Sequence, residues 1–228
     1  MRSDLFITGT DTEVGKTLAA CALTQGFREK GEKVLGMKPI AAGQNANGHN
    51  EDVLQLRAAG SFLAPLEEHS PYCFKAAMAP HLAALAEGGV IERTHILRAF
   101  EHLKVRADRV IVEGAGGFRI PLGFENGQPW DSADLAVSFG CPVILVVGLR
   151  LGCLNHALLT AEAIQSRGLS LAGWIGNTLN PEMPGLTENI QTLTRLLPCP
   201  VLGILPHLEN PEDALTASRA LNLSALLT

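Results

Sequence analysis

The feature that most constrains this chain is a glycine-bounded loop near its start. An apolar run at residues 4–8 leads into Gly9-Thr10-Asp11-Thr12-Glu13-Val14-Gly15-Lys16-Thr17, and an alanine-rich helical pattern follows. A strand, a loop and a helix start in this order gather unpaired backbone N–H groups at the positive end of a helix dipole, which favours anions. In such a loop Lys16 reaches phosphates and the Thr17 hydroxyl ligates Mg²⁺. The sequence therefore predicts a nucleotide site.

The spacing of this loop departs from the usual pattern. Five residues lie between Gly9 and Gly15, whereas the common phosphate-loop motif places four between its glycines. Gly-Lys-Thr also occurs in ordinary turns. The apolar run before the loop and the helical pattern after it favour a nucleotide site over such a turn.

Length and composition fit one α/β domain spanning residues 1–228. Hydrophobic residues make up 46% of the chain, which is enough for a large core. The longest apolar run, residues 141–147, is too short to cross a bilayer, and no leader precedes the first expected strand. The formal charge of −5 and the lack of a Lys/Arg cluster give no footprint for nucleic acid. We expect a cytoplasmic protein that binds neither nucleic acid nor membrane.

Cysteine and histidine give no sign of a metal site. The five cysteines, Cys21, Cys73, Cys141, Cys153 and Cys199, are scattered and form no Cys-x-x-Cys pair. We therefore expect buried free thiols rather than disulfides or zinc ligands. The seven histidines are equally dispersed and lack a metal-ligand spacing.

Apolar runs alternate with helical patterns along the whole chain. Strands are predicted at residues 4–8, 33–38, 109–113, 143–147, 171–176 and 201–205. Helices are predicted at residues 16–30, 51–59, 79–86, 93–104, 155–166, 186–196 and 213–220. Several strands are continuously apolar, as is typical of parallel strands covered on both faces. The predicted fold is α/β: a doubly wound, mainly parallel sheet with helices on both faces, of the phosphate-loop type.

In such a sheet, ligands bind outside the carboxyl ends of the strands. Two long segments that leave strand ends, residues 40–50 and 114–131, are expected to be irregular. Long loops in a compact domain are usually functional or disordered. The composition of residues 43–48 is that of a mobile loop.

Three charged side chains lie at or near these strand ends. Glu113 ends a buried strand before a glycine-rich turn, where a nucleotide-hydrolysing fold holds magnesium; alternatively, it caps the strand. Asp52, near a helix start, either completes an oxygen shell with Thr17 and Glu113 or is an ordinary first-turn acid. Lys38 either supplies a second cation for a migrating phosphoryl group or is a solvated strand-end lysine.

Weaker signals follow the later strands. Residues 152–156 open a helix whose free amides suit a carboxylate, although a plain glycine turn has the same sequence. Asn177 and the segment Pro206-His207-Leu208 lie where a nucleotide base could be recognised.

These pieces, in this order, resemble dethiobiotin synthetase, an enzyme family of biotin biosynthesis. The matching motifs are residues 8–17, 38–43, 112–117, 151–157 and 209–212. They run from near the first residue to the last fifth of the chain, and the variant loop is itself a family trait.

The resemblance implies that the chain joins 7,8-diaminononanoate to CO₂ with ATP and Mg²⁺. One substrate amine takes up CO₂ as a carbamate, and a carbamate oxygen attacks the γ-phosphate to give a carbamic–phosphoric anhydride. The second amine then attacks the carbonyl carbon, phosphate leaves, and the ureido ring closes. Phosphorylation makes a good leaving group of a poor one, and holding both amines in place supplies proximity.

The resemblance also implies roles for individual residues. Lys16 and Lys38 would stabilise the carbamate and the transferring phosphoryl group, and Thr17, Asp52 and Glu113 would hold Mg²⁺. The nucleotide and its metal would be contacted by Glu13, Val14, Gly15, Lys16, Thr17, Leu18, Asp52, Glu113, Gly114, Ala115, Gly116, Asn177, Thr178, Pro206, His207, Leu208 and Glu209. Thr12 and the 113–116 segment would line the substrate side.

The substrate carboxylate would be bound on the neighbouring subunit of a homodimer, by Gly152, Cys153, Leu154 and Asn155. One position departs from the family pattern: Ala42 stands where serine is frequent. A hydroxyl contact to the substrate amine or carbamate is then missing or is replaced by a backbone amide or water. We expect weaker substrate binding and the same reaction.

Three alternatives have different sequence requirements. ParA/MinD-like switch ATPases carry a lysine five positions before the loop lysine, and here that position is Asp11. Amide-forming synthetases of the cobyrinate or CTP type need an ammonia source, typically a fused domain for which this chain is too short. A non-catalytic nucleotide-binding module explains the loop but leaves Lys38 and Glu113 without a role.

Overall fold

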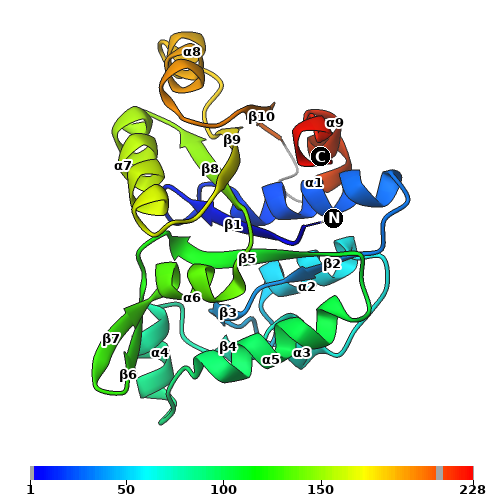
Figure 1. The fold of residues 1–228 in the computed structure, drawn as a ribbon, viewed down its shortest axis with the longest axis vertical. Helices are drawn as coiled ribbons and strands as arrows, with labels where there is room; N and C mark the ends of the chain where they lie inside the picture. The colour runs from blue at the N-terminus through cyan, green and yellow to red at the C-terminus, as the bar shows by residue number, and fades with distance from the viewer. Residues whose placement is uncertain (1–2, 209–212, 228) are drawn as a thin grey trace.

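The computed structural model describes residues 3–208 and 213–227. Its centre is a six-stranded parallel sheet with the strand order β10-β9-β8-β1-β5-β2, and helices cover both faces (Figure 1). The strands are β1 (Leu5–Gly9), β2 (Val34–Met37), β5 (Arg109–Gly117), β8 (Val143–Leu149), β9 (Leu171–Thr178) and β10 (Val201–Leu205). The predicted fold class and all six predicted strands are confirmed.

The sheet is buried on both faces because both sets of alternating side chains are apolar. In β1, Leu5 and Ile7 belong to the core under α1 (Lys16–Glu29), whereas Phe6 packs in the opposite core, with its ring 5.9 Å from that of Phe139. Successive side chains of a strand point to opposite faces, so a continuous apolar run fills two cores at once.

The helices divide between these two cores. One face carries α1, α2 (Glu51–Ala59) and α9 (Ala214–Arg219). The other carries α4 (Pro80–Ala86), α5 (Arg93–Lys104), α6 (Ser132–Phe139), α7 (Cys153–Ser166) and α8 (Leu186–Leu196). The short helix α3 (Leu66–His69) packs on α5 and β2, and a 3₁₀ turn, η1, covers Ser224–Leu226.

The two segments predicted to be irregular contain strands, so that prediction was wrong. In the first, β3 (Ile40–Ala42) pairs in parallel with β4 (Tyr72–Phe74). In the second, β5 continues to Gly117, and a hairpin forms from β6 (Pro121–Glu125) and β7 (Gln128–Asp131).

The sequence signals for these strands are short or easily passed over. β3 is only three residues long and has no periodicity to detect. The hairpin turns at Asn126-Gly127, both with positive φ, which is the strongest short-range hairpin signal. Helices α3 and α6 were also not predicted; α6 begins at a capping box between Asp131 and Asp134.

The thiols follow the prediction in part. All five cysteines lie among the described residues and none of them forms a disulfide; Cys21, Cys141 and Cys153 are buried, but Cys73 and Cys199 are half-buried. Within residues 3–208 and 213–227, none of the helices has the length and apolar character needed to cross a membrane.

Candidate active site

A pocket of about 1060 Å³ opens at the carboxyl ends of β1, β2, β5 and β9. Its walls come from distant parts of the chain, which the fold brings together. It is lined by Thr12, Glu13, Gly15, Lys16, Thr17, Leu18, Lys38, Ile40, Ala42, Asp52, Gln55, Ala77, Met78, Ala79, Pro80, Glu113, Ala115, Gly116, Ile120, Asn177 and Leu179. Most of the predicted site residues therefore face one cavity.

The glycine loop forms an open anion site at the start of α1. Gly15 is the N-cap with φ +91°, no side chain caps the helix, and the first turn contains no acid. A Cβ at Gly15 would overlap the side chain of Asn177, which donates a hydrogen bond from Nδ2 to the Val14 carbonyl at 3.1 Å. Glycine is required here both by the left-handed backbone and by this close approach. The first turn of α1 lines the pocket through Lys16, Thr17 and Leu18, and its uncapped amides suit a phosphate.

Lys16 is folded back on the loop that carries it. Its Nζ donates to the Asp11 carbonyl at 2.9 Å, and the residue is only 6% exposed. Burial lowers the pKa of the Lys16 ammonium group, while the nearby Glu113 carboxylate opposes this effect. A buried cation with a single carbonyl partner is poised to exchange that partner for a phosphate.

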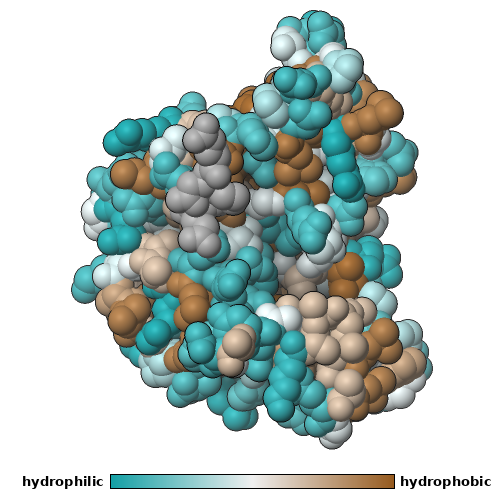
Figure 2. All heavy atoms as spheres, turned by 180° about the vertical axis from the view of Figure 1, so that it is seen from behind, coloured by the Kyte–Doolittle hydropathy of each residue, from teal (hydrophilic) through white to brown (hydrophobic). Residues whose placement is uncertain are grey.

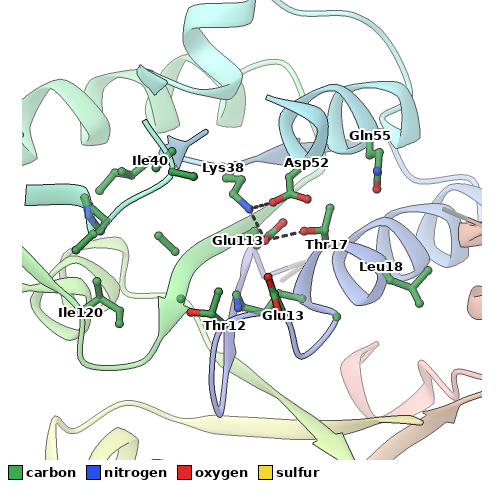
Figure 3. A pocket seen from close by; sticks show the side chains of 18 of the residues that line it. Thr12, Glu13, Thr17, Leu18, Lys38, Ile40, Asp52, Gln55, Glu113 and Ile120 are labelled. Atoms are coloured by element: carbon green, nitrogen blue, oxygen red, sulfur yellow. Dashed lines mark hydrogen bonds and ion pairs between the residues drawn. The ribbon is translucent and has the colours of Figure 1, made fainter. Parts of the chain in front are cut away.

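Lys38 lies between two carboxylates that line the same pocket (Figure 3). It directly follows β2, and its Nζ donates to Glu113 Oε1 at 2.8 Å and to Asp52 Oδ2. The hydroxyl of Thr17, from the phosphate loop, donates to the same Glu113 oxygen at 2.9 Å. The structure therefore joins Thr17, Lys38, Asp52 and Glu113 in one hydrogen-bonded cluster, which the sequence could only suggest.

Lys38 and Asp52 keep their charges in this cluster. Burial disfavours the ammonium form of Lys38, but Glu113 and Asp52 outweigh burial and raise its pKa above the ordinary lysine value. Burial also opposes ionisation of Asp52, but Lys38, with help from Thr17, lowers its pKa below the ordinary value. Lys38 is therefore a fixed cation beside the phosphate loop.

The oxygen atoms around Lys38 fit a magnesium ion. Mg²⁺ prefers carboxylate and hydroxyl oxygens, and Thr17, Asp52 and Glu113 provide them at one end of the pocket. Glu113 Oε2 is buried and has no hydrogen-bond partner, so it is a free acceptor. Over residues 3–208 and 213–227, no group of three or more His, Cys, Asp or Glu side chains is suited to a metal. A metal ion at this position would be held by the two carboxylates, the Thr17 hydroxyl and non-protein oxygens.

The side of the pocket away from the phosphate loop is apolar. It is formed by Ile40 and Ala42 of β3, Ile120, and the segment 77–80 before α4. Sequence analysis selected only Ala42 from this wall, because alanine, methionine and isoleucine carry no chemical signal in a sequence. Figure 2 shows that the surface over α4, at the lower right, is also apolar; Leu82 and Leu85 are its exposed large side chains.

Some predicted site residues do not line this cavity. Val14 is buried in the core and Gly114 packs against Phe6. Thr178 follows Asn177, and its carbonyl lies 3.3 Å from His207 Nδ1, so the ends of β9 and β10 meet near the loop. Glu209 lies outside the described residues. The other predicted site residues that do not line the cavity are Pro206, Leu208, Gly152, Cys153, Leu154 and Asn155.

Comparison with protein families and curated sequences gives a consistent result. The family model described as "AAA domain" matches residues 3–214. The ATP-dependent dethiobiotin synthetase BioD of Aromatoleum aromaticum is 52% identical over 93% of this chain and 94% of its own length. The enzyme of the same name from Ralstonia nicotianae is 50% identical over 96% of this chain and 95% of its own.

Solved structures share the fold at low sequence identity. The septum site-determining protein MinD from Pyrococcus horikoshii, complexed with Mg-ADP, matches with a TM-score of 0.54 and 16% identity, covering 100% of this chain and 89% of that one. A ParA family ATPase from Chlorobium tepidum matches with a TM-score of 0.57 and 11% identity over all of both chains. At these identities the likeness establishes the phosphate-loop fold alone.

Proposed function

The chain belongs to the ATP-dependent dethiobiotin synthetase family, and we propose that the pocket beside its phosphate loop closes the ureido ring. The chain is an ATP-dependent ligase of biotin biosynthesis. In the proposed reaction, 7,8-diaminononanoate, CO₂ and ATP give dethiobiotin, ADP and phosphate. The observation that carries the proposal is the position of Lys38, a buried cation between Glu113 and Asp52 that faces the same cavity as Lys16.

The phosphate side of the pocket binds ATP. The amides of the first turn of α1 and the Lys16 ammonium group bind the phosphates, and Lys16 exchanges the Asp11 carbonyl for a phosphate oxygen. Thr17, Asp52 and Glu113 would hold Mg²⁺, which would neutralise charge on the phosphate oxygens. The ends of β9 and β10, with Asn177, Thr178, Pro206, His207 and Leu208, would contact the nucleoside, and Glu209 is proposed for the same role.

Lys38 acts where negative charge builds up. One amine of the substrate adds to CO₂ and loses a proton, which leaves a carbamate anion. A carbamate oxygen then attacks the γ-phosphorus, and the bond to ADP breaks as the carbamic–phosphoric anhydride forms. Lys38 and Lys16 stabilise the charge on the carbamate and on the transferring phosphoryl group, because a fixed cation in a buried site needs no reorganisation.

The apolar wall and the backbone hold the substrate for the second step. The second amine attacks the carbonyl carbon, the bond to the phosphoryl oxygen breaks, and phosphate leaves. This step gains from proximity, because both amines belong to one bound molecule. Ile40, Ala42 and the segment 77–80 exclude water from the hydrocarbon chain, and Thr12 with residues 113–116 faces the reacting end.

We include a homodimer in this proposal. Gly152 is the left-handed N-cap of α7, and the residues from Gly152 to Asn155 lie away from the chain's own pocket. Leu151 is 95% exposed, and Leu158 and Leu159 of α7 are exposed as well. A second copy covering these leucines would bring the α7 N-terminus to the substrate carboxylate of its neighbour. A cytoplasmic location belongs to the same proposal.

A direct assay tests the reaction. The purified chain is incubated with 7,8-diaminononanoate, bicarbonate and MgATP, and dethiobiotin is sought by mass. We expect the ureido product together with ADP. ATP turnover without that product would instead support a switch ATPase or another nucleotide-using protein.

The role of Lys38 is tested by the Lys38→Ala variant. We expect it to bind nucleotide with an affinity close to that of the unaltered chain, because Lys16 and the loop amides remain. Ring formation should fall by roughly a hundredfold or more, the typical cost of removing one electrostatic group from a transition state. Lys16→Ala is the matched variant and should lose nucleotide affinity as well. Near-normal ring formation by Lys38→Ala would show that this lysine is only a structural ion-pair partner.

A further inference from the structure

The segment that ends in Lys38 lies at an edge of the sheet. β2 is the outermost strand, paired with β5 on one side only (Figure 1). An edge strand has polar backbone groups without a ladder partner on its free edge. In β2, residues outside the sheet bond to some of these groups: the Ser61 N–H, for example, donates to the Val34 carbonyl at 2.8 Å. Such contacts help to set where Lys38, which follows β2, lies.

One residue, His69, bonds to this free edge on both sides of Met37. Its ring nitrogen Nδ1 lies 2.6 Å from the Gly36 carbonyl oxygen, and its own carbonyl accepts the N–H of Lys38 at 2.8 Å. In a parallel ladder, a residue bonds through its N–H to the residue before its partner and through its C=O to the residue after. His69 reproduces that bridge with its side chain in the place of a backbone N–H.

The backbone N–H of His69 is not available for the bridge. It points into α3 and donates to the Pro65 carbonyl at 3.4 Å. Because His69 is the last residue of α3, only a side-chain donor of the right length can complete the pairing with β2. The imidazole Nδ1–H is such a donor, and the carbonyl acceptor fixes the proton on Nδ1.

The bridge sets the register of the pocket wall. Ile40 pairs with Tyr72, Ala41 with Cys73 and Ala42 with Phe74, so each partner lies 32 positions further along the chain, from 40 to 72. The distance from Met37 to His69 along the chain is the same. His69 therefore starts a parallel pairing at the same offset that β3 and β4 continue, and the Tyr72 N–H donates to the Pro39 carbonyl at 3.2 Å between them.

The burial of His69 agrees with a single dedicated hydrogen bond. The residue is 1% exposed, and its Nε2 is buried without a partner. An unpaired buried polar atom is unfavourable, so an apolar side chain would pack more favourably if packing were the only role of this residue. Burial, with a smaller effect from Arg57 of α2, lowers the pKa of His69 and keeps the ring neutral.

From these contacts we infer that His69 is a positioning residue for Lys38: its Nδ1–H completes a parallel bridge to the edge strand and fixes where the lysine enters the pocket. The inference rests on the proposed role of Lys38. His69 itself does not line the pocket, so no contact between His69 and the substrate is proposed. The effect of His69 should therefore appear in ring formation and in the KM for the diamine, and not in nucleotide binding.

Two amide variants separate this role from packing. In His69→Asn, Nδ2–H takes the place of Nδ1–H, whereas His69→Gln carries its amide one carbon further and cannot donate to Gly36 with the same backbone. We expect His69→Asn to keep most of kcat. His69→Gln should lose roughly tenfold to a hundredfold in kcat, the cost of misplacing a catalytic group by about 1 Å. Both should bind MgATP with unchanged Kd, which also reports that each is folded.

A double substitution identifies the residue through which His69 acts. If His69 works through Lys38, then His69→Gln should not lower ring formation further in the Lys38→Ala background. Equal kcat values for His69→Asn and His69→Gln, or a further loss in the double variant, would overturn the inference. Such a result differs from a failure of the proposed function. If the proposed function were wrong, the Lys38→Ala variant alone would keep its activity.

Discussion

Ala42, where the resemblance leads us to expect a serine, lies on β3 and lines the pocket. The Ala42 carbonyl accepts a hydrogen bond from Asn50 Nδ2 at 3.3 Å, so the backbone here is held by its neighbours. We therefore expect a serine hydroxyl at this position to affect ligand binding and not folding.

The Ala42→Ser variant should bind the diamine more tightly. One hydrogen bond contributes about 0.5–1.5 kcal/mol, so the KM for the diamine should fall by about threefold to tenfold, with the KM for ATP unchanged. Steady-state kinetics with each substrate varied in turn measures both values. An unchanged KM for the diamine would mean that a backbone amide or water already serves this contact.

His69 also links stability to pH. Burial holds its pKa in the folded chain below the ordinary histidine value of about 6.5. Between these two pKa values the unfolded chain binds a proton that the folded chain does not, so the free energy of unfolding falls as the pH drops through about 6.5. This contribution is absent in His69→Asn.

Urea unfolding of both proteins measures this effect. Between about pH 7.5 and about pH 5.5 the unaltered chain should lose more stability than His69→Asn, and the contributions of the other histidines cancel in the comparison. Parallel pH dependence of the two proteins would show that burial does not shift the pKa of His69.

At the level of secondary-structure elements, predictability depended on the length of the apolar pattern. The six strands of the central sheet were predicted from their apolar runs. The helical patterns between them correctly predicted α1, α2, α4, α5, α7, α8 and α9, and α2, α5 and α8 match their predicted ends. β3, β4 and α3 are three or four residues long and are held by tertiary pairing, which leaves almost no local signal.

The same contrast applies to the pocket. Glycine, lysine and carboxylate residues at strand ends are a chemical signal in a sequence, so the sequence analysis selected Gly15, Lys16, Lys38 and Glu113, and all four line the pocket. The apolar wall at residues 77–80 and the bridge at His69 depend on register between segments distant in sequence. The sequence therefore predicts the chemical groups of a site more readily than it predicts the packing that positions them.

The whole molecule has a widespread fold but differs from the switch ATPases in its phosphate loop. MinD and ParA proteins share the sheet, at 16% and 11% identity in the two structures compared. In this chain Asp11 occupies the loop position of the switch-type lysine and forms an ion pair with Arg150. The Thr12 amide and Arg150 hold the pKa of Asp11 below its usual range, so the loop presents a paired carboxylate at this point.

The proposed dimer makes a prediction about the exposed leucines of α7. Leu159 is 57% exposed, and Leu63, far from α7 in the chain, is 68% exposed. Leu159→Glu should shift the protein to a monomer in sedimentation, raise the KM for the diamine, and leave MgATP binding unchanged. Leu63→Glu is the matched control and should remain a dimer. A Leu159→Glu variant that stays dimeric would place the subunit contact elsewhere.

The central claim is that one pocket uses ATP to build a ureido carbonyl from CO₂. It is tested most directly by supplying ¹³C-bicarbonate with the diamine and MgATP, and measuring the label in the product together with the ADP released. We expect dethiobiotin that carries the label in its ureido carbonyl, with equal amounts of ADP and product. The Lys38→Ala variant should form no more than a trace of either. ADP release without labelled product would contradict it.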